Sequence, residues 1–373
     1  MADAIDHEGS AQVARPSESR RDPDWLRERL GHWLRRQEGP DARVTAVTVP
    51  ESNGMSSETL LAEASWGGQE RSLVIRVAPQ AESDPVFPSY DLDGQYRLID
   101  HVRTHSDIPL PRLWWSETGS AALGAPFFVM DRVDGQVPPD VMPYNFGSWV
   151  TEATPEQRSS MMCATVRVLA EIHRVPVPDV FIAQPAAGES PLAAHIRRLR
   201  DFYRWASAGR AGSPLIERAF AWVEQNRPEP TENVLTWGDA RIGNIMYRDF
   251  EPVAVLDWEM AALGPRELDI GWMIFLHRFF QDLAEMAGIE GLPDFLRRED
   301  VAAEYRRQTG HAPADLDFYT TYAALIHAVV MFRIQCRAIH FGLAAEPADP
   351  DELIMHRATL EAMLAGTYWE QVK

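Results

Sequence analysis

The stretch WGDARIGNIMYRDFEPVAVLDWE, residues 237–259, decides the fold. Two aspartates and an asparagine in it, Asp239, Asn244 and Asp257, stand at the ends of apolar runs. Burying such polar groups costs free energy unless a partner compensates for the lost water. VAVL is apolar at every position and predicts a buried strand, and Asp257 comes directly after it. A carboxylate at the mouth of a buried strand is held by rigid backbone and is suited to bind a metal ion.

The spacing of Asp239 and Asn244 matches the D-x-x-x-x-N catalytic loop of kinases. In such a loop the aspartate accepts the proton of the substrate hydroxyl, and the asparagine offers its amide oxygen to a metal ion. An isolated match of this kind is more often a capped turn. The buried strand before Asp257, with Gly264 and Asp269 in register beyond it, favours the kinase-like interpretation.

The same segment resembles the aminoglycoside phosphotransferase and choline-kinase-type family, which is related in fold to the protein kinases. WGDARIGN stands where the family has H-G-D-x-x-x-x-N, and VAVLDWEMAALGPRELDIGW where it has an I-D-W-E-like motif and then G-x-x-x-x-D. The resemblance runs from SNGMSSETLL through PFFVMDRVDG to Asp269. It is particularly close to the phosphotransferase branch that occurs fused to acyl-CoA dehydrogenases, which favours an arginine two residues after the catalytic aspartate.

The resemblance implies a fold and a set of roles. The fold is α+β and bilobal, protein-kinase-like, with a small N-terminal lobe of antiparallel sheet plus one helix and a larger, mostly helical C-terminal lobe. Asp239 matches the catalytic base, and Asn244 and Asp257 match the magnesium ligands. Arg241 stands where kinases place a lysine that contacts the transferring phosphoryl group, and arginine can stabilise that charge bidentately. Glu259 would hold a second metal ion or orient the substrate.

The first 130 residues predict the sheet of the small lobe. A helix is predicted at 90–105, and β-branched and apolar runs predict strands at 43–49, 59–66, 71–79, 112–117 and 125–133. Arg76 is a lone cation on an otherwise apolar strand face, where the family keeps a cation for the α- and β-phosphates of ATP. Gln95 takes the place of the glutamate that usually pairs with that cation, so an Arg76–Gln95 contact is expected, helped by Asp91. The alternatives are a surface cation and an ordinary amphipathic-helix residue.

Two segments complete the nucleotide site that the resemblance implies. SNGMSS (52–57) would form the loop over the phosphates, with backbone and hydroxyl donors from Ser52, Gly54, Ser56 and Ser57. FFVMDRVDG (127–135) would connect the lobes, and adenine would hydrogen-bond to the backbone of Val129, Met130 and Asp131. Without the family context, the first segment is a turn and the second is an edge strand that runs into a turn.

Beyond residue 150 the apolar residues recur at helical spacing. Helices are predicted at 155–175, 191–209, 214–226, 267–280, 298–308, 315–342 and 351–369. The expected organisation is a disordered tail at 1–21, a nucleotide-binding lobe at 22–131, and a helical lobe at 132–373 that holds the catalytic loop and the substrate pocket. Lone histidines in helical patterns, such as His173 and His327, are interpreted as core or surface residues.

Composition excludes several classes of partner. With 55 acidic against 36 basic residues the net charge is −19, which argues against nucleic acid and is weakly compatible with a cationic substrate. The two cysteines, Cys163 and Cys336, are far apart, which argues against a disulfide framework or a zinc site and fits a reducing, cytoplasmic location. No apolar run reaches the eighteen or so residues of a membrane span, so no membrane partner is expected.

Two positions depart from the family pattern. Trp237 replaces the histidine of the loop, and tryptophan can donate one N–H but accept nothing, so the loop geometry is in question. Gln95 replaces the glutamate of the ion pair. These changes motivate a rival hypothesis, a non-catalytic nucleotide-binding pseudokinase. A metal-dependent phosphohydrolase would explain neither the small β lobe nor Arg76. Asp269, behind Gly264, resembles the helix-start aspartate that braces the catalytic loop.

The sequence therefore predicts an ATP- and Mg²⁺-dependent O-phosphotransferase that acts on a hydroxyl of a small molecule. The family suggests an aminoglycoside-like cationic alcohol as the acceptor, and the particularly similar branch suggests a hydroxyacyl-CoA. HIRRLRDFYRW (195–205) could line a basic and apolar groove for an acyl-CoA, although the same segment also reads as an ordinary amphipathic helix. The oligomeric state is left open.

Overall fold

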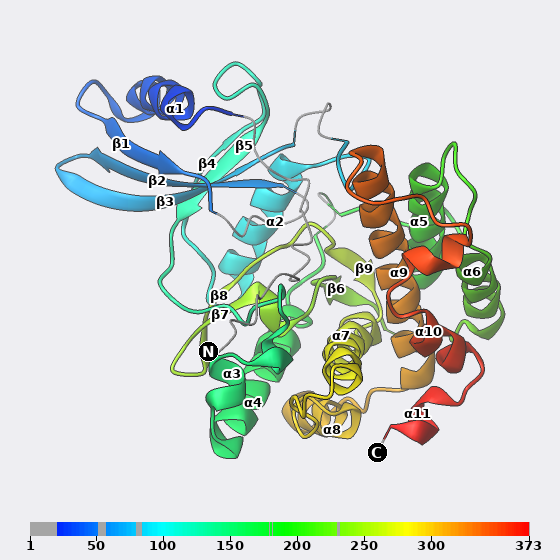
Figure 1. Ribbon diagram of the computed structural model, residues 1–373. Coiled ribbons are helices and arrows are strands. Elements are labelled where there is room, and N and C mark those ends of the chain that lie inside the picture. Colours follow the sequence, from blue (N-terminus) through cyan, green and yellow to red (C-terminus); the bar gives the residue numbers. More distant parts are fainter. Residues whose placement is uncertain are drawn as a thin grey trace, which may run out of the picture.

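A five-stranded antiparallel sheet forms the first lobe, and helices form the second (Figure 1). The computed structural model describes residues 21–50, 57–79, 84–178, 180, 182–229 and 232–372. The bilobal, kinase-like α+β fold expected from the sequence is confirmed. The predicted tail at 1–21 falls almost entirely outside the described residues.

The sheet has the strand order β1-β2-β3-β5-β4. Its strands are β1 (Arg43–Thr48), β2 (Glu58–Trp66), β3 (Gln69–Val77), β4 (Leu113–Glu117) and β5 (Phe127–Asp131). The β2–β3 hairpin turns at Gly67 and Gly68, whose φ angles of 58° and 75° suit the left-handed turn that matches strand twist. Alternate residues of β2 and β3 are buried, as period-two patterning requires. All five predicted strands are therefore present.

Two helices flank this sheet. Helix α1 (Pro23–Glu38) starts at Asp22, whose carboxylate accepts hydrogen bonds from the backbone N–H groups of Asp24 and Trp25. Helix α2 (Leu92–His105) lies between β3 and β4 in the chain, starts at Asp91, and packs against β4 and β5. It is the helix predicted at 90–105, two residues shorter at its start.

The second lobe consists of helices and two small two-stranded sheets. The helices are α3 (Trp149–Glu152), α4 (Pro155–Ile172), α5 (Pro191–Ala206), α6 (Pro214–Asn226), α7 (Glu267–Met286), α8 (Arg298–Thr309), α9 (Leu316–His340), α10 (Arg357–Leu364) and α11 (Tyr368–Gln371). The sheets pair β6 (Val234–Thr236) with β9 (Ala262–Gly264) and β7 (Ile245–Arg248) with β8 (Glu251–Val255). These sheets lie between the large sheet and the helices (Figure 1).

The single helix predicted at 351–369 is wrong. The segment forms a 3₁₀ turn at Pro350–Leu353, then α10 and α11. Between the turn and α10 the chain carries the buried His356, whose Nε2 lies 2.8 Å from the carbonyl oxygen of Ala324. After α10, Gly366 adopts a left-handed φ of 73°, which ends the helix. The sequence pattern of 351–369 is continuous and helical, but the packing of His356 and the turn at Gly366 divide the segment into three short elements.

Helix α9 is the central helix of the large lobe and packs against α5, α6, α7 and α10. Its length and the mean hydropathy of its most apolar window, 1.3, would be sufficient for a helix that crosses a membrane. However, 61% of that window is buried inside the protein. The core helix of a globular domain has the same properties.

Candidate active site

The loop that is predicted to be the catalytic loop connects β6 to β7. Gly238 adopts a φ of 89°, and a Cβ atom there would lie 2.1 Å from the carbonyl oxygen of Met260, so only glycine fits. The loop then tightens into a 3₁₀ turn at Ile242–Asn244. The backbone N–H of Leu256 donates to the carbonyl of Asn244 at 2.8 Å, which ties the loop to the end of β8. This hydrogen bond brings the segment that contains Asn244 next to the segment that contains Asp257.

Asp239 is held by three side chains. The indole N–H of Trp272 donates to Oδ1 at 2.7 Å, and the Asn244 amide donates to Oδ2 at 2.6 Å. The Nε–H of Arg241 is shared between both oxygens, at 3.0 and 3.1 Å. Only 15% of the Asp239 side chain is exposed. Hydrogen bonds to a carboxylate are short and strong, so this network fixes the orientation of the group.

Arg241 links Asp239 to a second carboxylate, Asp140, to which its Nη1 donates. Burial would lower the pKa of the Arg241 guanidinium, but the charges of Asp239 and Asp140 outweigh that effect and raise it. The arginine therefore stays charged. A Cβ atom on Gly243 would lie 2.4 Å from Arg241 Nη1 and 2.6 Å from Asp140 Oδ1. The glycine is needed because the ion pair passes directly beside it.

Asp257 follows β8 with a left-handed φ of 56°. Its Oδ1 is buried and has no hydrogen-bond partner among the described residues. Burial raises the pKa of Asp257, the nearby Arg76 opposes the rise, and the charge of Asp239 adds to it. A buried carboxylate oxygen without a partner is costly, and a bound cation would remove that cost.

A magnesium ion fits this arrangement. Asn244 uses its amide nitrogen on Asp239, so its amide oxygen is left for a cation. Carboxylate and amide oxygens are the ligands that Mg²⁺ prefers, and Mg²⁺ typically completes its shell with water and phosphate oxygens. The described residues contain no cluster of three or more His, Cys, Asp or Glu that could hold a metal alone. Asn244 and Asp257 thus suit an ion that arrives with a nucleotide.

Trp237 performs a definite structural task in place of the usual histidine. It is fully buried, and its indole N–H lies 3.0 Å from the carbonyl oxygens of both Leu256 and Asp257. A single donor therefore spans the two carbonyls next to the candidate metal ligand. Although the family usually has histidine at this position, the tryptophan keeps the loop attached to the end of β8.

Asp269, at the start of α7, holds the backbone of the loop. Its carboxylate accepts the N–H groups of Trp237, at 2.7 Å, and Gly238, at 2.8 Å. Nε2 of His173, at the end of α4, lies 3.0 Å away, while the Tyr305 hydroxyl lies 2.8 Å from Nδ1 of the same ring. His173 is buried, in agreement with its interpretation as a core or surface residue, but the sequence did not indicate this support. Such contacts are what a bracing aspartate requires.

The expected contact between Arg76 and Gln95 is not formed. Arg76, on β3, donates instead to Oγ1 of Thr59 at 2.8 Å, since the two residues are direct partners in the β2–β3 register. The Gln95 side chain makes no hydrogen bond with a described residue, and Asp91 is occupied in capping α2 through the N–H of Gly94. The charge of Arg76 still acts on the site, where it opposes the rise in the pKa of Asp257.

The predicted adenine contacts of Val129, Met130 and Asp131 stay a prediction, and the structure restricts the backbone groups that could make them. Strand β5 is not an edge strand, since β3 pairs with one side of it and β4 with the other. The N–H groups of Asp131 and Arg132 donate to carbonyls of neighbouring chain segments, at 2.8 and 2.9 Å. The N–H groups of Asp131 and Arg132 are therefore already engaged within the sheet.

The remaining predicted residues have mixed outcomes. Ser52, Gly54 and Ser56 lie outside the described residues. Ser57 is buried at the start of β2, and its hydroxyl has no partner among the described residues. Glu259 lies close to Tyr90, whose pKa burial raises to about 12, with the Glu259 charge adding to the rise.

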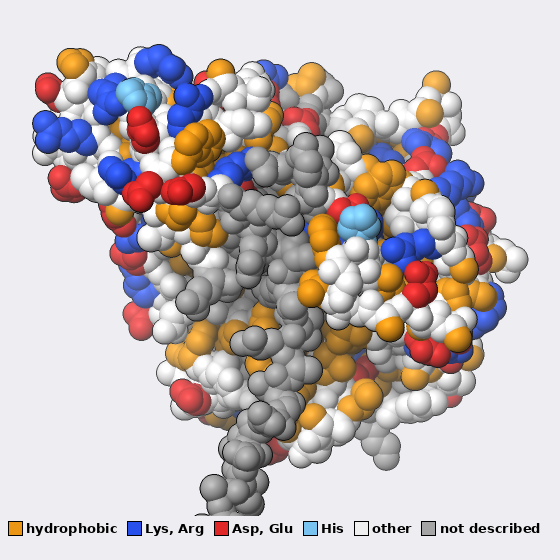
Figure 2. Space-filling view, turned by 45° about the horizontal axis from the view of Figure 1, so that its top comes forward, with side chains coloured by type: hydrophobic (Ala, Val, Ile, Leu, Met, Phe, Trp, Pro, Cys, Tyr) orange, Lys and Arg blue, Asp and Glu red, His pale blue; other side chains and the backbone are white. Residues whose placement is uncertain are grey.

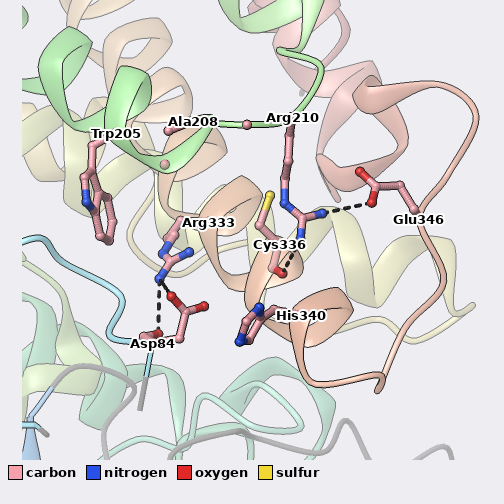
Figure 3. A pocket seen from close by; sticks show the side chains of 10 residues that line it. Asp84, Trp205, Ala208, Arg210, Arg333, Cys336, His340 and Glu346 are labelled. Carbon is pink, nitrogen blue, oxygen red and sulfur yellow. Dashed lines mark hydrogen bonds and ion pairs between the residues drawn. The ribbon is translucent and has the colours of Figure 1, made fainter. Parts of the chain in front are cut away.

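A hollow of about 480 Å³ lies away from the catalytic loop, between the C-terminal ends of α5 and α9 (Figure 3). Its two arginines are occupied: Arg333 donates to Asp84 at 2.7 Å, and Arg210 to Glu346 at 3.1 Å. Arg333 also stacks on Trp205, 4.5 Å from the ring centroid. On the face drawn in Figure 2, acidic and basic side chains are interspersed on the described surface.

Sequence comparison extends the likeness beyond the loop. A model of the phosphotransferase enzyme family matches residues 52–315. A probable acyl-CoA dehydrogenase of Arabidopsis thaliana is 22% identical, over 73% of this chain and 34% of its own length. Acyl-CoA dehydrogenase family member 11 of Homo sapiens is 26% identical, over 61% of this chain and 27% of its own length. The chain thus spans about a third or less of these relatives.

Two solved structures share the fold over both lobes. A putative aminoglycoside phosphotransferase of Ralstonia eutropha has a TM-score of 0.66 and 21% identity, and the match covers 92% of this chain and 98% of that one. A thermostable aminoglycoside phosphotransferase mutant, solved as a ternary complex with ADP and hygromycin B, has a TM-score of 0.56 and 15% identity, with 90% and 98% covered.

Proposed function

Because the chain belongs to the phosphotransferase enzyme family, we propose that it transfers the γ-phosphoryl group of ATP to a hydroxyl of a small molecule. The convergence of Asp239, Asn244 and Asp257 around one loop carries the proposal. Asp239 is oriented by three donors, and Asp257 keeps a buried oxygen that a cation would satisfy. A nucleotide-binding pseudokinase would account for a cation at Asp257, but not for the three donors that orient Asp239.

Each residue then has a chemical task. Asn244 and Asp257 would hold Mg²⁺, which when bound neutralises charge on the β- and γ-phosphates. Arg76 would contribute positive charge on the nucleotide side, consistent with its effect on Asp257. Nη2 of Arg241 makes no hydrogen bond with a described residue, so it is available to the transferring phosphoryl oxygens.

Asp239 would accept the proton of the acceptor hydroxyl. The acceptor oxygen forms a bond to the γ-phosphorus as the bond to the bridging oxygen of ADP breaks, and the proton goes to the Asp239 carboxylate. Trp272 and Asn244 fix that carboxylate, so little reorganisation is needed during transfer. Positioning and charge neutralisation supply most of the catalysis in reactions of this type.

Two acceptor classes follow from the comparisons. The names of the curated relatives favour a hydroxyacyl-CoA, and the hygromycin B complex of a fold relative favours an aminoglycoside-like alcohol. We rank the hydroxyacyl-CoA first, because it comes from sequence relatives. Helix α5 adds little to this choice. Its apolar residues Ile196, Leu199 and Tyr203 are buried, and Arg200 pairs with glutamates of α6, as in an ordinary amphipathic helix.

The test is ADP release with Mg-ATP across panels of hydroxyacyl-CoAs and aminoglycosides. Turnover on one panel that Asp239→Asn reduces by roughly 10²–10⁴-fold would support the proposal and assign the acceptor class. Calorimetry of Mg-ATP binding accompanies it. Absence of both turnover and nucleotide binding would refute the proposal, and binding without turnover on any acceptor would favour the pseudokinase.

A further inference from the structure

His327, on α9, lies one aromatic ring away from the candidate base. The indole of Trp272 donates to Asp239, and its ring centroid lies 6.4 Å from that of His327. The charge of Arg241 also contributes to lowering the pKa of His327. His327 is half-buried, whereas its neighbour His356 is buried.

The hydrogen bonds of this pair define which ring nitrogens carry hydrogen. Nε2 of His356 lies 2.8 Å from the carbonyl oxygen of Ala324, which can only accept, so Nε2 is the donor. A neutral imidazole has one N–H, so Nδ1 of His356 carries a lone pair and can only accept a hydrogen bond. Nδ1 of His327 lies 3.3 Å from Nδ1 of His356 and must therefore be the donor. Nε2 of His327 is then left as an acceptor.

Both rings are neutral at ordinary pH. They are packed against Phe275 and Phe279, with ring centroids 4.7 to 5.7 Å apart. Burial lowers the pKa of His356 to about 4, and burial, with the charge of Arg241 adding, holds the pKa of His327 well below its usual value. The hydrogen bond of the His327 side chain to a described residue is made by Nδ1, which leaves Nε2 without such a partner, and the side chain is half-buried.

We propose that Nε2 of His327 binds the acceptor, by accepting a hydrogen bond from an O–H or N–H group a few bonds from the hydroxyl that is phosphorylated. The inference rests on the proposed function, and it adds a specificity rule. A molecule with its hydroxyl at Asp239 would have to extend past Trp272 to reach His327, because Trp272 contacts both residues. A hydrogen-bond donor of the acceptor molecule would pair with the lone pair on Nε2 of His327. A carboxylate, phosphate or carbonyl oxygen would face the same lone pair and be disfavoured.

The tautomers are tested first, independently of any substrate. In protein labelled with ¹⁵N-histidine, long-range ¹H–¹⁵N spectra distinguish the two neutral forms, and His327→Asn and His356→Asn assign the resonances. We expect hydrogen on Nδ1 of His327 and on Nε2 of His356. Hydrogen on Nε2 of His327, or a protonated His327 near pH 7, would overturn the inference.

A matched pair of variants then tests binding. Asparagine places its amide near Nδ1, so His327→Asn keeps a donor towards His356 and lacks the Nε2 acceptor. Glutamine reaches the Nε2 position with its amide oxygen, so His327→Gln retains an acceptor. We expect His327→Asn to raise the KM for the acceptor roughly three- to tenfold with the KM for ATP unchanged, and His327→Gln to restore most of the loss.

The outcomes separate this inference from the proposed function. An unchanged acceptor KM in His327→Asn, or equal damage in both variants with a raised KM for ATP, would refute the binding role. Turnover by the wild type with no shift of the His327 Nε2 resonance on acceptor addition would also refute it and leave the proposed function intact. If panel compounds shift this resonance and none of the compounds on either panel is phosphorylated, the result would support the contact and contradict the proposed function.

Discussion

The indole N–H of Trp272 lies 2.7 Å from Oδ1 of Asp239, one turn of α7 after Asp269. Residues three apart on a helix share a face, so α7 presents two supports to the same loop. Asp269 holds the backbone of the loop, and Trp272 holds its carboxylate. Orientation of the base and attachment of the loop therefore depend on one helical turn.

Trp272→Phe should lower kcat about tenfold or more, since it removes a hydrogen bond to a carboxylate and keeps most of the packing. The KM for ATP should be little affected. Trp222→Phe is the matched control, because Trp222 stacks on Phe318 and its indole N–H has no partner among the described residues. Steady-state kinetics of both variants check the prediction, and equal effects would contradict it.

Asp269→Asn should destabilise the protein by about 3 kcal/mol or more. The asparagine amide would turn an N–H group towards the N–H donors that the carboxylate now accepts, in a site with no exposed area. Urea unfolding measures the effect. Asp317→Asn, at an aspartate whose side chain is 75% exposed, should change stability by less than about 0.5 kcal/mol. Similar urea midpoints for the two variants would argue against the brace.

Gly243→Ala should lower kcat while leaving the fold intact. The added Cβ meets Arg241 Nη1 and Asp140 Oδ1, which are the ends of side chains and can move apart. The ion pair would open, and Arg241 would lose its position. Asp140→Asn removes the same pair by another route, so the double variant should be no worse than either single one. Additive losses in kcat would show that the two changes act separately.

Asp257→Asn should make the metal-free protein more stable. Burial raises the folded-state pKa of Asp257 above its unfolded value, so its ionised form costs stability above that pKa and costs none below the unfolded value. Near pH 7, with chelator, the variant should melt about 1–3 °C higher than the wild type. Mg-ATP should raise the Tm of the wild type and have little effect on the variant. A lower Tm with chelator would contradict this assignment.

The sequence was sufficient for the fold because the relevant patterns are local. Strand alternation, the Gly67–Gly68 turn and the apolar run before Asp257 each occupy a few neighbouring residues. The family motif then placed the catalytic loop. Trp272 could have been found by counting one helical turn from Asp269.

Other contacts had no comparable signal. Asp140 lies 101 residues before its partner Arg241, and His173 lies 96 residues before its partner Asp269. No periodicity in the sequence indicates either contact. The predicted contact between Arg76 and Gln95 is absent because the register of β2 and β3 places Thr59 directly opposite Arg76, which donates to it. Such outcomes depend on tertiary geometry, which spacing alone does not contain.

The contacts of Asp269 also bear on how the protein assembles. His173 lies 96 positions before it in the chain, and the loop residues about 30 positions before it. Contacts of such long range form late, because the intervening chain must first be ordered. We expect partly folded forms to acquire helices before the loop takes its final geometry. Nucleotide binding would then report completed folding of the large lobe, which makes it a stricter quality test than helix content.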